Sequence, residues 1–298
     1  MTLEQKLSGW TAPSSVTEKE KQDRTERLIK RAMEKHEPLS ESKWRVFAKG
    51  SYANNTNVKL DSDVDIAVEC TDCFYSDGDS GESDDTGPYS GIWTPSKFRT
   101  EVQAALEAEF AGRVDCSGST AFRVNPNSSS VDADVVPCFS YRYYYSPGNF
   151  REGTKVFKKD GSSLVNYPKQ QLDIGRDKNN RTGHAYKKAV RIMKRVENAM
   201  VEEDKYKEVP SYLVECLVYN CPDDVLLRST WVDTIRGVIA HIYNELGGEE
   251  PFDDSLRWCE PNDIKYLFHH SQPWGRNDGR RFARGFADAA WDYLGYEP

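Results

Sequence analysis

Short stretches in the first half of the chain alternate apolar and polar residues, which is the pattern of β-strands. In 63–69 the apolar residues Val64, Ile66 and Val68 alternate with others that include Asp63 and Asp65. Because successive side chains of a strand point to opposite faces, the apolar set faces a core and the two carboxylates share the other face. We therefore predict a strand over 63–69 that carries two acids on one side.

Other stretches repeat apolar residues at the spacing of a helix. Over 16–36, apolar residues such as Met33 recur among Glu, Lys and Arg, and Thr17 followed by Glu20 is typical of a capping box. The stretch 71–95 is rich in Asp, Ser and Gly and is predicted to be an exposed, mobile insertion. The other predicted elements are strands at 44–48, 121–124 and 131–144, and helices at 95–110, 182–200, 210–219, 224–246, 262–269 and 278–293.

The order of these elements predicts an α+β protein, with strands before residue 166 and helices after it. We predict that residues 1–165 form a sheet lobe that starts with a long N-terminal helix. Residues 166–298 would form a helical lobe, and the cleft between the two lobes would hold the active site.

The composition is that of a folded protein, because 38% of its 298 residues are hydrophobic and 12% are aromatic. No apolar run approaches the roughly 20 residues of a membrane-spanning helix, and the first 15 residues lack the apolar core of a secretory signal. We expect a cytoplasmic protein with no membrane partner. The net charge of -8 gives no strong case for nucleic-acid binding, although small nucleotides remain open as partners.

The seven cysteines are an odd number scattered through a long chain, so we expect free thiols rather than a disulfide framework. Cys70-Thr71-Asp72-Cys73 has the spacing of half a zinc site. Since no second Cys pair or His pair lies at a suitable distance in the sequence, cysteines near a strand end are the favoured interpretation.

Two motifs upstream of residue 70 indicate a site for phosphate chemistry. Gly50-Ser51 follows the predicted strand 44–48 and is suited to cradle a phosphate, and Asp63 and Asp65 point together at whatever this turn holds. Two ionised carboxylates so close together need cations between them. Magnesium prefers oxygen ligands and also bridges nucleotide phosphates, so the pattern predicts a two-metal site for nucleotidyl transfer.

A third carboxylate on a neighbouring strand would complete such a site. Asp134 in the predicted strand 131–144 is the best candidate by position, and Asp132 is the alternative. Asp61 precedes the apolar alternation and is expected in the connecting turn, where it would cap backbone amides. An Asp-x-Asp alone is a weak signal because exposed strand carboxylates are common. The second acidic strand downstream is what favours a metal site.

The predicted helical lobe offers cations and an aromatic ring. Lys187, Arg191 and Lys194 lie about a turn apart on one helix face, from which their side chains could reach a triphosphate. A solvated basic face is the competing interpretation. At the start of the helix 210–219, Ser211 could donate to a phosphate oxygen and Tyr212 could stack on a base. An N-cap serine and a buried core tyrosine are the alternatives for these two.

In combination these motifs resemble those of the cGAS/DncV-like nucleotidyltransferases, bacterial enzymes that make cyclic oligonucleotide signals in CBASS antiphage defence. The resemblance covers nearly the whole chain and is greatest to clade E (CdnE). It is carried by Gly50-Ser51-Tyr52, Asp63-Val64-Asp65, Asp134-Val135-Val136-Pro137, Arg191-Ile192-Met193-Lys194 and Pro210-Ser211-Tyr212-Leu213-Val214-Glu215.

The resemblance implies a polymerase-β-like nucleotidyltransferase core in which Asp63, Asp65 and Asp134 hold two Mg²⁺ ions, with Mn²⁺ as a substitute. It further implies that Gly50 and Ser51 grip the donor phosphates. In the helical lobe it implies that Lys194 and Ser211 contact the triphosphate and that Tyr212 stacks on the donor base.

The resemblance also bears on the substrates. Val165-Asn166-Tyr167-Pro168-Lys169 occupies the stretch that reaches the nucleobase, and an Asn at position 166 goes with uracil in similar branches, since an amide offers both a donor and an acceptor to a pyrimidine edge. We expect UTP as one substrate, ATP as a second candidate, and a downstream effector that senses the product.

Two rival functions remain open at this stage. One is a nucleotidyltransferase that modifies a macromolecule or a small molecule. The other is a non-catalytic nucleotide-binding protein, which three acids held together without metal disfavour, because their mutual repulsion is costly.

Overall fold

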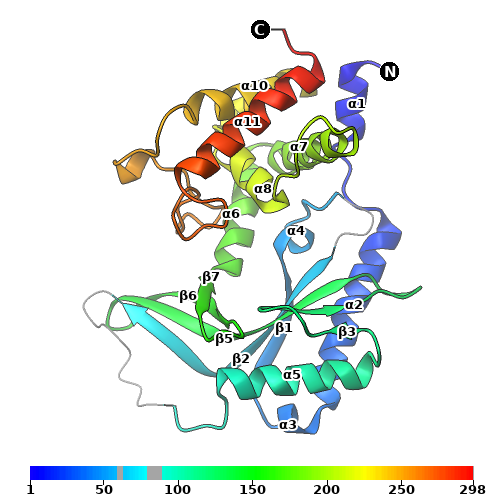
Figure 1. Ribbon diagram of the computed structural model, residues 1–298, viewed down its shortest axis with the longest axis vertical. Helices are drawn as coiled ribbons and strands as arrows, with labels where there is room; N and C mark the ends of the chain where they lie inside the picture. The colour runs from blue at the N-terminus through cyan, green and yellow to red at the C-terminus, as the bar shows by residue number, and fades with distance from the viewer. Residues whose placement is uncertain (59–62, 79–88, 298) are drawn as a thin grey trace. The chain divides into compact units, whose positions relative to one another are not determined.

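The computed structural model describes residues 1–58, 63–78 and 89–297, and the chain forms two compact units (Figure 1). We call them the sheet unit (Ser14–Ala53 and Lys59–Lys169) and the helical unit (Met1–Pro13, Asn54–Val58 and Gln170–Pro298). The fold class is α+β, as predicted. The predicted division after residue 165 differs from the observed one, because the units change after Lys169 and two segments near the N-terminus belong to the helical unit.

Seven strands among the described residues form one mixed sheet, in the order β1-β2-β5-β4-β3, with β6 paired to β5 and β7 to β6. β1 pairs antiparallel with β2, and β2 pairs parallel with β5. β5 pairs antiparallel with both β4 and β6. The strands are β1 (Trp44–Lys49), β2 (Val64–Gly78), β3 (Val114–Asp115), β4 (Phe122–Val124), β5 (Ala133–Ser146), β6 (Asn149–Phe157) and β7 (Ser163–Asn166).

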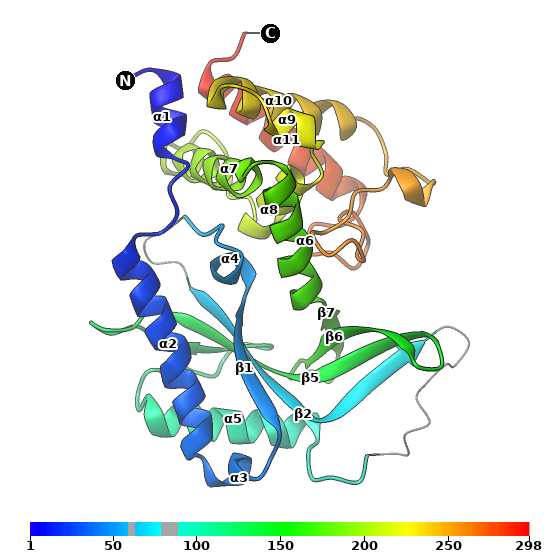
Figure 2. The ribbon, with the colours of Figure 1, turned by 180° about the vertical axis from the view of Figure 1, so that it is seen from behind.

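Helices cover one face of this sheet, and the core of the sheet unit lies beneath them. Helices α2 (Val16–Lys35) and α5 (Pro95–Glu109) lie over this face (Figure 2). Val64, Ile66 and Val68 are buried in one cluster with Met33 of α2 and Phe98 of α5. The period-2 alternation of β2 therefore leaves its acidic side chains on the face away from α2 and α5. The helices of the unit are α2 (Val16–Lys35), α3 (Glu37–Ser40), α4 (Gly50–Ala53) and α5 (Pro95–Glu109).

The helical unit has its own core, in which Leu7, Ile192, Leu217, Ile239 and Phe286 are all fully buried. In the described part of the chain, no helix is both long and apolar enough to cross a membrane. The helices are α1 (Leu3–Gly9), α6 (Pro168–Arg181), α7 (Ala185–Glu202), α8 (Ser211–Tyr219), α9 (Asp223–Leu226), α10 (Trp231–Glu245) and α11 (Asn277–Leu294), and a 3₁₀ turn, η2, spans Asp254–Leu256. The first two residues of α6 belong to the sheet unit.

The N-terminal helix α1 belongs to this unit because it caps α10. Both carboxylate oxygens of Glu4 accept backbone N–H groups at the start of α10, from Trp231 at 3.1 Å and Val232 at 2.9 Å. Free N–H groups at a helix start favour an anionic partner. Leu7, on the next turn of α1, completes the attachment by its burial in the core.

Several predicted boundaries were wrong for identifiable reasons. The predicted helix 262–269 is not helical, because the Asn262 side chain accepts the N–H groups of Ile264 and Lys265 and so forms a turn instead. The predicted helix 224–246 is split into α9 and α10, and Thr230 caps the second part. Helix α2 is capped by Ser15, not by Thr17.

The predicted insertion 71–95 was also partly wrong. β2 continues to Gly78, because its residues from Phe74 onward pair with β5 after a bulge. Residues 79–88 and Asp61 lie outside the described residues. The seven cysteines are free thiols, as predicted.

Candidate active site

The three predicted carboxylates come together on one face of the sheet. Asp65 is the second residue of β2 and Asp134 the second residue of β5, and the parallel register places them directly opposite one another. Asp63 lies two residues before Asp65 and thus on the same side of the chain. The backbone N–H of Val64 donates to the Asp132 carbonyl at 2.9 Å, which extends this pairing to the point where Asp63 emerges.

These carboxylates interact unfavourably with one another. Burial raises the pKa of Asp65, while the charge of Lys49 lowers it and that of Asp63 raises it. Burial likewise raises the pKa of Asp134, followed by the charge of Asp65. The pKa of Asp63 is raised by burial, with Asp134 adding to the shift. Burial is the main cause of all three shifts, and the neighbouring cations Arg123 and Lys49 oppose it.

Two cations that the sequence did not reveal stand beside this acidic face. Lys49 Nζ lies 3.8 Å from Asp65 Oδ1. Arg123 Nη2 lies 3.4 Å from Asp63 Oδ1 and 3.4 Å from Asp132 Oδ2. Asp132, the alternative third acid, is thus engaged by arginine. Only the strand pairing could have identified these two cations from the sequence. Lys49 is opposite Asp65 in the β1–β2 register, and Arg123 is opposite Asp134 in the β4–β5 register.

The donor set of this face fits magnesium, since Asp63, Asp65 and Asp134 offer only oxygen ligands and their charges repel one another. The side chains are not, however, arranged as a complete set of metal ligands. Within residues 1–58, 63–78 and 89–297, no group of three or more His, Cys, Asp or Glu side chains has the spacing of a metal site. The acids of this face therefore offer the oxygen ligands that magnesium prefers, but among the described residues they do not have the spacing of a metal site.

The predicted phosphate turn lies directly against one of the acids. Gly50 begins α4 with a φ of +69°, and a Cβ at this position would come within 2.3 Å of Asp65 Oδ2. Only glycine allows this close approach and this backbone conformation without strain. The next residues, Ser51 and Tyr52, are half-buried, and the Tyr52 hydroxyl donates to Asp23 of α2. The turn therefore lies close against Asp65 and is tied to α2 through Tyr52.

Asn166, the predicted base-reading residue, ends β7 and pairs with Thr154 of β6. Its side chain is half-buried. The following residue, Tyr167, is buried, and its ring lies over Gly153, where a Cβ would come within 3.0 Å of the ring. Packing of an aromatic ring on a strand glycine fixes the backbone at the end of β7.

The other predicted nucleotide-binding residues belong to the helical unit. Lys187 of α7 is half-buried, and burial lowers its pKa. Lys194, two turns further along α7, is 2% exposed, and its Nζ lies 3.2 Å from Glu215 Oε2. Arg191 between them donates to the backbone carbonyls of Thr11 and Asn55 at 2.8 and 2.6 Å. The stripe is therefore not a solvated basic face, because two of its cations are buried among partners.

Ser211 and Tyr212 form the start of α8. Ser211 is exposed, whereas Tyr212 is half-buried with its hydroxyl 3.0 Å from Glu260 Oε2. Burial raises the pKa of Tyr212 well above its ordinary value, and the nearby acid adds to the shift. Glu260 is itself held by Gln272, whose amide donates to Oε1 at 2.6 Å. The ring of Tyr212 is therefore fixed through its hydroxyl.

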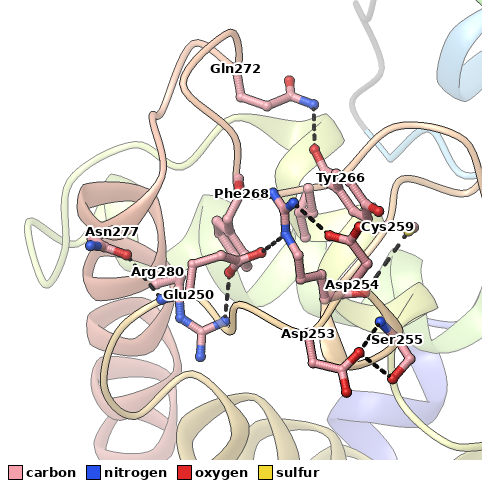
Figure 3. A network of polar contacts seen from close by, with 12 residues as sticks. Glu250, Asp253, Asp254, Ser255, Cys259, Tyr266, Phe268, Gln272, Asn277 and Arg280 are labelled. Carbon is pink, nitrogen blue, oxygen red and sulfur yellow. Dashed lines mark hydrogen bonds and ion pairs between the residues drawn. The ribbon is translucent and has the colours of Figure 1, made fainter.

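The loop that carries Glu260 and Gln272 is fastened by a separate ion-pair cluster (Figure 3). Glu250 accepts from Arg257 Nε at 3.1 Å and from Arg280 Nη1 at 2.9 Å, and its backbone N–H donates to Asn277 Oδ1 at 3.0 Å. The carboxylate of Glu250 is completely buried, so both of its oxygens need these donors. This cluster ties the loop to the start of α11.

Comparisons with known proteins agree with this geometry. A family model described as the cGAS/DncV-like nucleotidyltransferase C-terminal helical domain matches residues 173–295. A curated relative from Legionella pneumophila, named cyclic dipyrimidine nucleotide synthase CdnE, is 36% identical over 98% of this chain and 97% of its own length.

Two solved structures are similar over nearly the whole chain. The CdnE cyclic dinucleotide synthase of Elizabethkingia meningoseptica, with GTP and Apcpp, has a TM-score of 0.80 and 30% identity, covering 98% of this chain and 99% of that one. The CdnE c-UMP-AMP synthase of Rhodothermus marinus, with Apcpp and Upnpp, has a TM-score of 0.81 and 28% identity, covering 99% and 98%.

Proposed function

The chain belongs to the cGAS/DncV-like nucleotidyltransferases, in clade E, and from this premise we propose that it joins nucleoside triphosphates into a cyclic di- or oligonucleotide without a template. The observation that carries the proposal is the register of Asp65 opposite Asp134 on adjacent parallel strands, with Asp63 beside them. All three pKa values are raised, so the site favours a divalent cation that would relieve the repulsion.

We assign Asp63, Asp65 and Asp134 as the ligands of two Mg²⁺ ions, for which Mn²⁺ could substitute. When bound, the ions would activate an acceptor 3′-hydroxyl and neutralise the departing pyrophosphate. The acids hold and orient the reacting groups. Gly50, which has no side chain, leaves room for donor phosphates next to Asp65 Oδ2, and its neighbour Ser51 would bind those phosphates.

Each round of the reaction forms one bond and breaks one. The acceptor 3′-oxygen bonds to the α-phosphorus, the bond from that phosphorus to the bridging oxygen breaks, and pyrophosphate leaves while the hydroxyl proton passes to solvent. A second round on the linear product closes the ring. Because both rounds use the same three acids, a linear intermediate with a 5′-triphosphate should be detectable.

In the helical unit, we assign Lys187, Lys194 and Ser211 to the triphosphate and the ring of Tyr212 to the donor base. Support comes from the exposure of Ser211 at the start of α8 and from the hydrogen bond that fixes Tyr212 to Glu260. Lys194 would contact phosphate with Glu215 as its neighbour, so its charge is already shared.

We further propose that UTP is a substrate and that the product contains a pyrimidine, with ATP as a second nucleotide. Asn166 supports this, because its amide can both donate to and accept from a uracil edge. The Legionella relative is named for dipyrimidine products, while the two similar structures hold GTP with Apcpp and Apcpp with Upnpp. We propose that an effector senses the product during antiphage defence.

The experiment is a product analysis. Purified protein is incubated with Mg²⁺ and four labelled NTPs, with each NTP omitted in turn, treated with phosphatase, and its products are resolved by chromatography. We expect a phosphatase-resistant cyclic product that disappears when UTP is omitted. A labelled macromolecule instead of a cyclic product would support the modifying enzyme, and nucleotide binding without turnover would support a non-catalytic protein.

A further inference from the structure

A buried hydrogen-bond network holds the segment that follows the phosphate turn. Asn54 comes directly after α4, which carries Gly50 and Ser51. The Asn54 amide donates to Glu215 Oε1 at 2.5 Å, and the Thr56 hydroxyl donates to Glu215 Oε2 at 2.5 Å. Lys194 Nζ donates to the same Oε2 at 3.2 Å. All these groups belong to the helical unit.

The network is deeply buried, which makes its geometry demanding. Asn54 and Thr56 are 0% exposed, Glu215 is 1% and Lys194 is 2%. A buried carboxylate needs both a countercharge and donors for its oxygens, and here Lys194 supplies the charge. Hydrogen bonds to a charged group are stronger than those between neutral groups. The two neutral donors therefore tie their own backbone to Glu215.

A further contact holds the same segment from α7. Arg191 Nη1 donates to the carbonyl of Asn55 at 2.6 Å, so three consecutive residues, 54 to 56, are each bonded to α7 or α8. Gly175 of α6 encloses Asn54 as well, because a Cβ at Gly175 would lie 3.1 Å from Asn54 Oδ1. The backbone directly after the phosphate turn is therefore held on several sides.

We propose that Glu215 is a positioning residue for the phosphate turn. By fixing Asn54 and Thr56, it sets the backbone at the end of α4, and through chain continuity the Gly50-Ser51 turn. Lys194 contributes by holding the Glu215 carboxylate in place. The inference rests on the proposed function in one respect, namely that the Gly50-Ser51 turn binds a triphosphate.

The test removes one donor to Glu215 Oε2 and leaves the residues of the turn, the three acids of the sheet, Lys194 and Glu215 unchanged. Thr56→Val deletes the hydroxyl at nearly constant volume, and Thr56→Ser keeps it. Thr234→Val is the matched control, because Thr234 is also buried in the helical unit, at 1% exposure, and its hydroxyl donates to the Thr230 carbonyl at 2.9 Å. For each variant we would measure the Kd of a non-hydrolysable NTP with Mg²⁺, together with the unfolding midpoint temperature.

We expect Thr56→Val to weaken NTP binding about tenfold, as the loss of a hydrogen bond to a charged group predicts, and Thr56→Ser to restore it. Thr234→Val should lower the midpoint temperature without changing Kd. Equal Kd values for Thr56→Val and the wild type would overturn the inference, since Thr56 would then serve stability only. Should Thr56→Val not fold, Asn54→Ala removes the other neutral donor and is judged by the same comparison.

The binding experiment can fail or succeed independently of the test of the proposed synthase activity. Binding is measured without turnover, so a wild-type protein that binds NTP but makes no cyclic product would refute the synthase and leave the role of Glu215 standing. A wild-type protein that binds no NTP would refute both.

Discussion

Two sets of acids in this molecule are built in opposite ways. In the helical unit, Glu215 and Glu250 are buried, and each carboxylate has its own cation and further donors. In the sheet unit, Asp63 and Asp65 keep 38% and 42% of their side chains exposed, and they share a face with Asp134. The first set is paired within the protein, while the pKa values of the second are raised, chiefly by burial and further by the neighbouring acids.

The difference teaches where a ligand is needed. A protein buries a carboxylate only when it can pair it, so the complete pairing of Glu215 and Glu250 indicates structural roles. Asp65 faces Lys49 and Asp63 faces Arg123, and these contacts are longer than the one that Arg280 makes to Glu250. A shortage of positive charge at an accessible face favours a divalent cation and the phosphates that come with it.

The largest effect is expected from the acid that lies opposite Asp65. Asp134→Asn keeps the shape of the side chain but removes its charge, and we expect the rate of synthesis to fall roughly a thousandfold. Asp132→Asn is the matched control, because the Asp132 carboxylate already pairs with the half-exposed Arg123, and its loss should lower the rate of synthesis less than about tenfold. Initial rates at saturating NTP and Mg²⁺ provide the measurement. A greater loss from Asp132→Asn would reverse the assignment of the two acids.

The comparison predicts that removing an acid from the two sets changes the free energy of unfolding by very different amounts. Glu250→Ala leaves the buried Arg280 without its countercharge, so we expect the free energy of unfolding to fall by about 3–5 kcal/mol. Asp65→Ala removes a repelling charge and should change that free energy by no more than about 1 kcal/mol. Urea unfolding followed by circular dichroism, without Mg²⁺, measures both. If the two variants lost equal stability, the contrast between the two sets of acids would be wrong.

The smallest effect concerns a neutral residue outside both sets. Asn166→Ser shortens the side chain and replaces its amide, and we expect the ratio of kcat/KM for UTP to that for a purine NTP to fall by about tenfold. The maximal rate with the preferred NTP should change less, because the acids are intact. Competition between labelled UTP and ATP in one reaction gives the ratio. An unchanged ratio would remove Asn166 from base selection.

Much of the sheet could be predicted because its central strands are strongly patterned. The alternation around Ile66 and Val135 predicted which side chains face the core. It therefore also predicted that the acids between them lie on the opposite face. β6 and β7 were missed, since stretches such as 149–157 mix Arg, Glu, Gly and Lys without a clean period. Helix α6 was missed for a related reason, because it is strongly polar and its only buried residues are Gly175 and Lys178.

Contacts between distant residues could not be predicted from local pattern. The pairing of Lys194 with Glu215 depends on how α7 packs against α8, and the donors Asn54 and Thr56 come from far earlier in the chain. A stripe of cations on a helix has the same sequence signature whether it faces water, phosphate or a buried acid. Only the fold distinguishes these cases.

The most direct test of the central claim is synthesis by the wild type beside the double variant Asp63→Ala, Asp65→Ala. Both are incubated with labelled UTP, ATP and Mg²⁺, and phosphatase-resistant cyclic product is quantified, while circular dichroism checks the fold. We predict cyclic product from the wild type and none from the folded variant. Cyclic product from the variant at a rate near that of the wild type would contradict the claim that these acids carry the reaction.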